Sequence, residues 1–306
     1  MKQASEFVLP HNLSGNPESS TILVYLHGYP DSIRLWDPFY EPYEKENLVL
    51  RISYPNFDAR LHEAWGRDFP ELIKSIKETI DYAKDGKDYK VFVVSHDWGA
   101  NFTYRFDKAY PNYINNGIIM DIGWETPSDL RTTLISFSYQ FYLALAFLLP
   151  KGIGTAMSNL FLKVSLKEHV PYNKDDLDNS INYPYYYVHK MNLIQAAVLL
   201  IVYIMCWLTN RNLLFWAFLL LFVAYKYFTW GNNNSLAGYK PSFPLSFIYG
   251  LQKGFMFHTD NVIQYLQNKE NCEVHGIEKG HWVMDNNEQF LNEMISRRLK
   301  MVITSQ

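Results

Sequence analysis

The sequence has little cysteine and no marked excess of either charge. Its two cysteines are Cys206, inside an apolar run, and Cys272, near the C-terminal end, so we expect neither a disulfide framework nor a zinc site. The 28 basic and 31 acidic residues give a formal net charge of -3, and the basic residues form no stripe. This argues against a nucleic-acid partner bound through phosphate contacts. No metal or organic cofactor is implied.

Targeting signals are also missing from the start of the sequence. The first twenty residues, MKQASEFVLPHNLSGNPESS, lack the apolar segment of a secretory signal peptide. They are not rich in arginine, so a standard transit peptide is not indicated either. Since cysteine use requires no oxidising environment, we expect an intracellular location.

Charge is almost absent from two long runs. Residues 191–209 contain no charged side chain, and residues 213–230 contain only Lys226. Three residues separate the runs, which predicts an antiparallel helical hairpin. At ~1.5 Å per residue each arm is about 27 to 28 Å long, close to the ~30 Å hydrocarbon thickness of a bilayer. We therefore predict a membrane-inserted hairpin, with buried helices of an apolar lid as the alternative.

Short apolar segments alternate with segments of helical spacing over the rest of the chain. Strands are expected at 21–28, 47–55, 90–97, 117–123, 244–250 and 272–277, and helices at 69–83, 99–110, 259–268 and 288–301. This order predicts an α/β fold with a doubly wound, mostly parallel sheet covered on both faces. The core domain would comprise 1–122 and 240–306, and 123–239 would be an inserted, mainly helical lid that includes the hairpin.

Three motifs follow predicted strands, at the sheet edge where the chemistry of doubly wound folds is found. They are LHGYPDS (26–32), SHDWGA (95–100) and GIEKGHWVMDN (276–286). In the second, Asp97 stands two residues before Gly99, the position of the nucleophile in a strained strand-to-helix turn whose neighbours must be small. The simpler interpretation of Asp97 is a helix N-cap.

Taken together, HGYP, SHDWGA and KGHWVM resemble the α/β-hydrolase superfamily, and within it the branch of epoxide hydrolases and haloalkane dehalogenases, whose nucleophile is Asp. The resemblance covers 6–123 and 243–306, and almost none of the lid. It implies that Asp97 is the nucleophile and that His281 is the base that activates water. It also implies that the backbone N–H groups of Tyr29 and Trp98 hold the oxyanion.

The acid that orients His281 is less clear from the motifs. The family usually places it after the strand at 244–250, but the loop there, LQKGFMFHTD, has no acid before Asp260. A minority of relatives carry the acid after the preceding strand, where this chain has Asp121. A carboxylate at the end of an apolar strand needs a partner to offset its desolvation. We favour Asp121 and keep Asp260 as the alternative.

The choice between epoxide and halide substrates depends on the lid. The His-Gly-x-Pro turn resembles epoxide hydrolases, which use lid tyrosines to donate a proton to the oxirane oxygen. The segment NYPYYYVHK offers Tyr185 and Tyr187 for this role. Tyrosines beside an apolar hairpin are equally typical of a membrane-interface belt.

Three functions remain open at this point. The first is a membrane-associated epoxide hydrolase whose lipophilic small-molecule substrate arrives from the lipid bilayer. The second is a haloalkane dehalogenase on the same scaffold. The third is a catalytically silent accessory subunit of a membrane protein complex, bound to other subunits through its lid. For a membrane location, both the endoplasmic reticulum and the mitochondrial inner membrane fit.

Overall fold

The computed structural model describes residues 5–127, 129–166, 169–171, 173–189 and 236–304, and a few positions between 202 and 214. Its centre is a seven-stranded sheet with the order β1-β3-β2-β4-β5-β6-β7. The strands are β1 (His11–Gly15), β2 (Thr21–Leu26), β3 (Leu48–Ile52), β4 (Lys90–His96), β5 (Asn116–Met120), β6 (Leu245–Gly250) and β7 (Glu273–Ile277). Only β1 is antiparallel to its neighbour, and all other pairs are parallel.

The central strands are apolar on both sides because the sheet is covered on both faces. Successive side chains of β2 point to opposite faces. Ile22 and Val24 join the larger hydrophobic core, whereas Leu23 and Tyr25 join the second core behind the sheet. All six residues of β2 are buried. Continuous apolar runs of this kind are typical of parallel strands.

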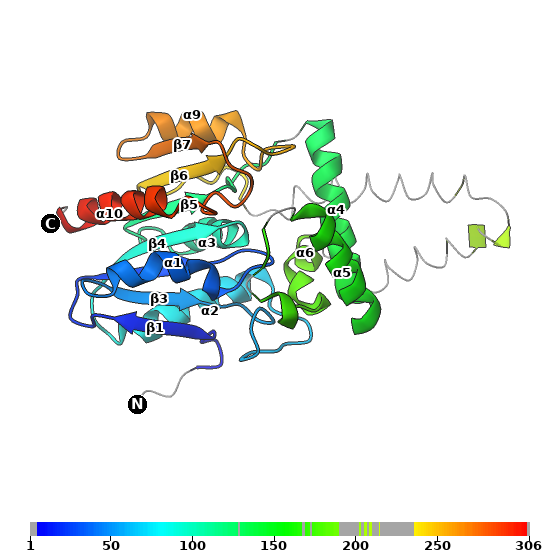
Figure 1. Cartoon of the computed structure of the whole chain (residues 1–306), viewed down its shortest axis with the longest axis horizontal. Helices are drawn as coiled ribbons and strands as arrows, with labels where there is room; N and C mark the ends of the chain where they lie inside the picture. The colour runs from blue at the N-terminus through cyan, green and yellow to red at the C-terminus, as the bar shows by residue number, and fades with distance from the viewer. Residues whose placement is uncertain are drawn as a thin grey trace.

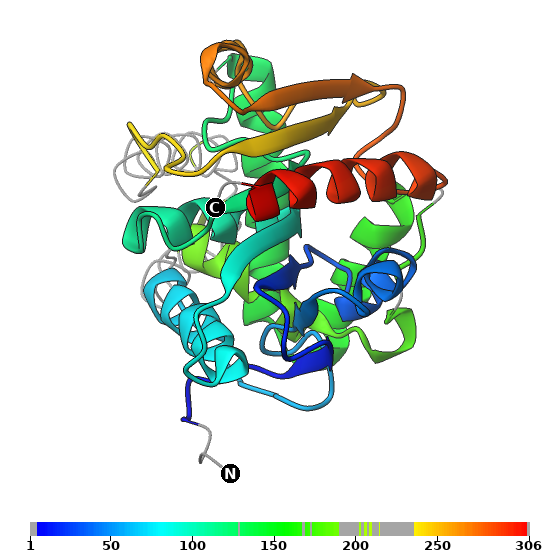
Figure 2. The ribbon, with the colours of Figure 1, turned by 90° about the vertical axis from the view of Figure 1, so that its left-hand side faces the viewer.

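The helices divide between the two faces, as the end-on view in Figure 2 shows. Apolar residues of α2 (Phe69–Lys84), α3 (Trp98–Ala109) and α9 (Asp260–Asn268) belong to the larger core. Those of α1 (Asp37–Tyr40) and α10 (Glu288–Thr304) belong to the second core. Two short 3-10 helices, η1 (Ile33–Trp36) and η2 (Glu41–Tyr43), flank α1.

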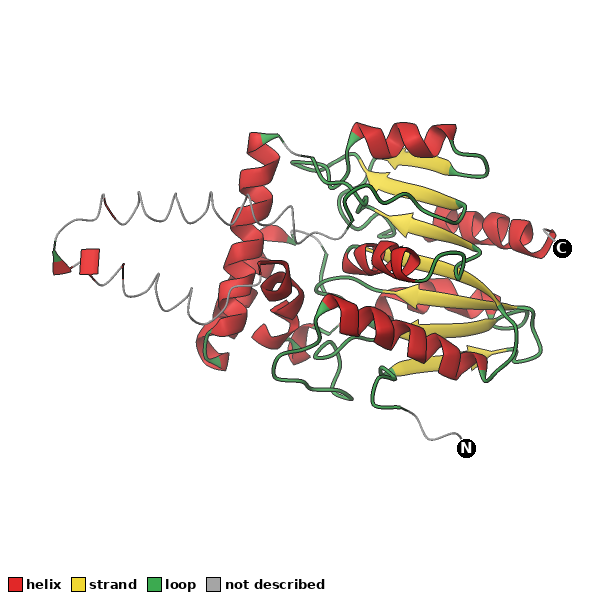
Figure 3. Ribbon diagram, turned by 180° about the vertical axis from the view of Figure 1, so that it is seen from behind, coloured by secondary structure: helices red, strands yellow, loops and turns green. Residues whose placement is uncertain are grey.

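Three further helices lie across the end of the sheet to which the parallel strands point (Figures 1 and 3). They are α4 (Leu130–Leu148), α5 (Lys151–Ser165) and α6 (Tyr183–His189), with η3 (Lys174–Asp176) and η4 (Asn179–Asn182) between α5 and α6. The Nδ2 of Asn179 donates to the carbonyls of Ala146 (2.8 Å) and Leu149 (3.0 Å), which satisfies groups at the end of α4. These contacts tie η4 to the end of α4.

The predicted fold class is confirmed in its doubly wound, mostly parallel sheet, and each predicted strand and helix of the core is present. Two details differ. The strand expected at 117–123 ends at Met120, because Asp121 has a left-handed backbone (φ +68°), and β1 was not predicted. The division into core and lid stays a prediction, although the strands of the described residues all lie within 11–120 or 245–277.

The predicted hairpin arms, 191–209 and 213–230, lie almost entirely outside the described residues. Within the part of the chain that is described, no helix combines the length and the apolar character needed to cross a membrane. This includes α4, which contains most of the uncharged segment before Pro150.

Candidate active site

Asp97 occupies a strained turn between β4 and α3. Its backbone angles are φ +52° and ψ −119°, a conformation that residues other than glycine rarely adopt. It stands at the N-cap position of α3, yet its side chain makes no capping hydrogen bond. The carboxylate therefore does not cap the helix, which argues against the simpler N-cap interpretation.

Two glycines make this turn sterically feasible. A Cβ on Gly28 would lie 2.4 Å from the Cβ of Asp97 and 2.7 Å from its Oδ2. A Cβ on Gly99 would lie 2.2 Å from the carbonyl oxygen of Leu26. Both distances are far below van der Waals contact, so only glycine lets the turn after β2 and the start of α3 pack against Asp97.

The Asp97 carboxylate is held from two sides. The backbone N–H of Tyr29 donates to Oδ2 at 2.8 Å, and the Nε2 of His281 lies 3.4 Å from Oδ1. Burial alone would raise the pKa of Asp97, but the hydrogen bond and charge of His281 outweigh it and lower the pKa. Asp97 is thus an ionised carboxylate in a largely buried site.

The second nitrogen of His281 contacts Asp121, which follows β5. The Nδ1 of His281 lies 2.5 Å from Oδ2 of Asp121, whose side chain is fully buried. The other oxygen, Oδ1, accepts from the N–H of Gly250 at 3.1 Å and from the ammonium of Lys253. Burial would raise the pKa of Asp121, but the positive charges of His281 and Lys253 outweigh burial and lower the pKa to about 2.

His281 is consequently protonated at neutral pH in this state. Burial would lower its pKa, but the Asp121 and Asp97 carboxylates raise it to about 9. His96 packs against it with ring centroids 4.7 Å apart and an Nε2 lying 3.0 Å from the His281 carbonyl oxygen. Burial, followed by the charge of His281, lowers the pKa of His96 to about 4, so His96 stays neutral. The resting site is an imidazolium between two carboxylates.

The structure brings together most of the residues singled out in the sequence. Asp97, His281 and Asp121 form one connected chain of contacts, and the N–H of Tyr29 points at Asp97. Asp260 is instead the first residue of α9, and Asp121 takes the contact with His281. The N–H of Trp98 has no contact with Asp97 among the described hydrogen bonds, so its part in an oxyanion site stays a prediction.

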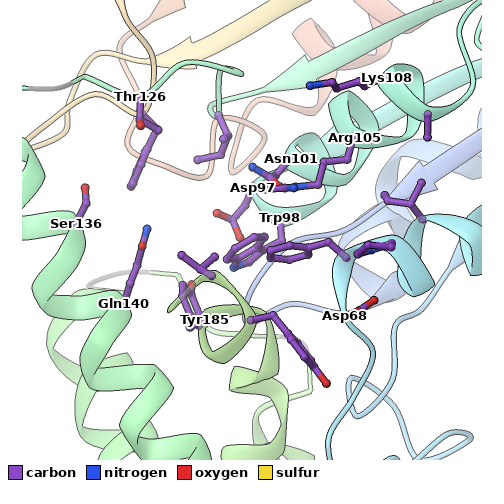
Figure 4. Close-up of a pocket in the computed structure, with 18 of the residues that line it drawn as sticks. Asp68, Asp97, Trp98, Asn101, Arg105, Lys108, Thr126, Ser136, Gln140 and Tyr185 are labelled. Carbon is purple, nitrogen blue, oxygen red and sulfur yellow. The ribbon is translucent and has the colours of Figure 1, made fainter. Parts of the chain in front are cut away.

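A cavity of about 470 Å³ opens in front of Asp97, between α3 and the helices α4 and α6. Its size is that of a small-molecule site, and aromatic and apolar side chains form much of its wall. Figure 4 shows Gln140 of α4 on the side opposite Trp98, with Arg105 and Lys108 placed along α3 away from Asp97.

Two lid tyrosines stand next to the carboxylate. Tyr185 of α6 packs edge-on against Trp98 and lines the cavity, as does Tyr139 of α4, with the two tyrosine rings 6.1 Å apart. Burial raises the pKa of both phenols, and the charge of Asp97 raises it further. They therefore keep their protons and can donate them. Tyr187 also lines the cavity, and burial, followed by the charge of Asp68, raises its pKa to about 12.

Two residues of this site were not predicted from the sequence. Tyr139 lies in the uncharged part of α4, residues 132–148, with no motif around it, so no local signal marks it. Lys253 could have been noticed, because it is the charged residue in the loop where an acid was expected and none was found. Only the fold shows that its ammonium meets Asp121.

A second histidine is bound by two carboxylates nearby. His169, between α5 and η3, lies 2.9 Å from Asp31 and 2.8 Å from Asp285. Its ring stacks on Trp282 at 4.1 Å, and the Trp282 indole donates to Asp31 at 2.7 Å. Burial lowers the pKa of His169, but the two carboxylates outweigh it and raise the pKa to about 9. This cluster ties the lid to the loop that carries His281.

Among the residues that the structure describes, no group of three or more His, Cys, Asp or Glu side chains is arranged to hold a metal ion.

Comparisons with known proteins agree with this geometry. Mouse (Mus musculus) epoxide hydrolase 3 is 26% identical over 114 residues, covering 36% of this chain and 29% of that protein. The chain thus matches less than a third of the length of this curated relative. No model of a protein family matches the chain.

Solved structures match over almost the whole chain. A mutant epoxide hydrolase from Bacillus megaterium superposes with a TM-score of 0.62 at 16% identity, covering 95% of this chain and 96% of that one. A loop variant of a haloalkane dehalogenase from Bradyrhizobium elkanii gives 0.60 at 10% identity, with 96% and 93% covered. The resemblance is confirmed at the level of the fold: the chain has the α/β-hydrolase fold, and over 114 residues its sequence is similar to an epoxide hydrolase.

Proposed function

We propose that this chain is a hydrolase of the epoxide hydrolase type, which opens a lipophilic epoxide through an ester on Asp97. The observation that carries the proposal is the chain of contacts from Asp97 through His281 to Asp121, built on a strained turn. A silent scaffold has no physical need of a strained Asp that contacts a paired His and lines a cavity. The similarity in sequence to one epoxide hydrolase and in fold to another supports the same reaction.

In the first step a carboxylate oxygen of Asp97 attacks a ring carbon of the epoxide. Oδ1 is the oxygen available for attack, because Oδ2 already accepts the N–H of Tyr29. A C–O ester bond forms, the ring C–O bond breaks, and the ring oxygen takes a proton. Tyr185 and Tyr139 line the cavity, and burial and the Asp97 charge keep both phenols protonated. Their hydroxyls are the proposed proton donors to the ring oxygen.

In the second step water hydrolyses the ester. Esterification removes the negative charge of Asp97, which was one of the two carboxylates that raised the pKa of His281. The imidazole can then be neutral and take a proton from water, which attacks the ester carbon. The N–H of Tyr29 stabilises the oxyanion on the former Oδ2. Collapse releases the diol and restores the Asp97 carboxylate and the protonated His281.

Membrane association is part of the proposal and is supported by the sequence alone. The uncharged runs 191–209 and 213–230 would place the lid in a bilayer, from which a lipophilic substrate reaches the cavity. Other subunits of a membrane assembly would fit the same apolar surface. Flotation of the native protein with liposomes, compared with a variant lacking 191–230, tests this part. Recovery of both proteins in the unbound fraction would contradict it.

The reaction is tested by trapping the ester. In His281→Gln the base is gone, so the intermediate should accumulate when the protein is incubated with styrene oxide or dodecene oxide. Intact-mass spectrometry should show a gain equal to the whole epoxide, because ring opening expels nothing. The gain should be lost in the double variant Asp97→Ala/His281→Gln.

Parallel incubation with bromohexane separates the two enzyme activities. A haloalkane adduct would add only the alkyl group, because bromide leaves, and its formation without an epoxide adduct would assign the chain as a dehalogenase. No adduct from either class, on protein shown to be folded, would contradict both activities and favour the silent accessory subunit.

A further inference from the structure

Lys253 is a buried lysine that the mechanism above does not use. It lies in the loop between β6 and α9, and its side chain is 7% exposed. Its ammonium meets Oδ1 of Asp121, the oxygen that does not face His281. A lysine is rarely buried unless it is paired with an opposite charge, so the burial of Lys253 depends on this contact with Asp121.

The backbone holds Lys253 in place from both sides. The N–H of the preceding Gln252 donates to the carbonyl of Lys279 at 2.8 Å, in the segment that leads to His281. Further along the loop, the carbonyl of Phe257 accepts the N–H of Gly123 at 3.0 Å, just after Asp121. The Lys253 ammonium also lies 5.3 Å from the centroid of the Phe257 ring. The loop is therefore fastened to both segments that carry the His281–Asp121 pair.

The charges around His281 balance only when Lys253 is counted. Asp97 and Asp121 are negative, and protonated His281 and Lys253 are positive, so the four sum to zero. His96, the other titratable group packed on His281, is neutral. Two features follow from the proposed cycle. The opened ring needs one proton, and His281 must lose one proton before it can serve as a base.

We propose that Lys253 is a positioning residue that holds Asp121 against His281 and offsets the Asp121 charge, so that His281 gives up its proton once Asp97 is esterified. This inference rests on the proposed function. In the ester state Asp97 is neutral, and Asp121 and Lys253 form a neutral pair. Without Lys253, the Asp121 charge alone would act on the imidazole and keep it protonated.

The proton count supports this role. Ester formation consumes the Asp97 carboxylate and one proton. The donor tyrosine gives this proton to the ring oxygen and regains one at the expense of His281, so the net proton consumed is the one that His281 loses. Ester hydrolysis turns water and the ester into a diol, a carboxylate and one proton, which equals the proton that His281 regains. The cycle therefore runs only if the pKa of His281 lies above the working pH in the free state and below it in the ester state. Burial and the Lys253 charge lower the pKa of His258, a further titratable group near this ion pair.

The test is the pH dependence of ester decay, followed after rapid mixing with styrene oxide by tryptophan fluorescence and by intact mass. Lys253→Gln keeps a hydrogen-bond donor but removes the charge, and Lys253→Arg keeps the charge. We expect Lys253→Gln to shift the pH midpoint of ester decay upward by about 1 unit or more, and to slow decay about tenfold at pH 7. Lys253→Arg should retain the wild-type midpoint. The rate of ester formation should change little in either variant.

If wild type, Lys253→Gln and Lys253→Arg share the same pH midpoint of ester decay, the inference is overturned. If no ester forms in the wild type or in His281→Gln, the proposed function is contradicted instead. If Lys253→Gln fails to fold because it leaves the buried Asp121 charge without its ion pair, the double variant Asp121→Asn/Lys253→Gln should fold, since both buried charges are gone. A double variant no more stable than Lys253→Gln would contradict the pairing.

Discussion

The backbone strain at Asp97 can be measured with two substitutions that both remove the carboxylate, Asp97→Gly and Asp97→Ala. Both lose the contacts with Tyr29 and His281. They differ in that glycine adopts φ +52° and ψ −119° freely, whereas alanine is strained there as Asp is. Strain of this kind costs about 1–3 kcal/mol. The extra freedom of glycine in the unfolded chain offsets about 0.4–1 kcal/mol of that.

We therefore expect Asp97→Gly to be more stable than Asp97→Ala by about 1.3 kcal/mol, the difference between the midpoints of these two ranges. The assay is urea unfolding of the two variants, with midpoints compared at equal slopes. The control is the same pair at Lys163, an exposed position within α5, where glycine should be less stable than alanine by about 0.5–1 kcal/mol. Equal stability of the two variants at position 97, or greater stability of the alanine variant, would refute the claim that the backbone of the turn at Asp97 is strained.

Three other changes separate packing, chemistry and pH dependence. Gly28→Ala should lower stability by about 1–3 kcal/mol and displace Asp97, whereas Gly254→Ala, with open space around it, should not; urea unfolding measures both. Tyr185→Phe should slow ester formation about 100-fold and leave ester decay unchanged in a rapid-mixing assay. Because the pKa of His169 is raised to about 9, its stabilisation of up to about 3 kcal/mol is present below about pH 6.5 and lost as pH rises through 9. The unfolding free energies of wild type and His169→Phe should converge above that pH, and a constant difference would contradict the ion-pair account.

The strand-to-helix turn at Asp97 could be predicted from the sequence because its requirements are local. The strain at Asp97 demands small neighbours at fixed spacing, and Gly99 supplies one of them two residues away. The apolar runs of the strands were likewise readable, since both faces of a central parallel strand are buried. The role of Asp121 was implied by the resemblance to relatives that carry the acid after this strand, and the need of a carboxylate ending an apolar strand for a partner supported it.

The remaining parts of the site depend on contacts between distant segments. Tyr139 reaches the cavity only because α4 crosses the end of the sheet, and nothing near it in the sequence indicates this. The ion pair between Lys253 and Asp121 joins residues 132 positions apart. His169 meets Asp31 and Asp285 in the same way, from three separate loops. Such pairs become visible only when the fold sets the distances.

The central claim, that Asp97 is the nucleophile, is tested most directly by a single turnover of styrene oxide in water labelled with heavy oxygen, with protein in excess. If Asp97 forms the ester, the new oxygen of the first diol comes from its carboxylate. The diol should then be unlabelled, and the peptide that contains Asp97 should carry the label. A labelled diol together with an unlabelled Asp97 peptide would show direct attack by water and would contradict the account.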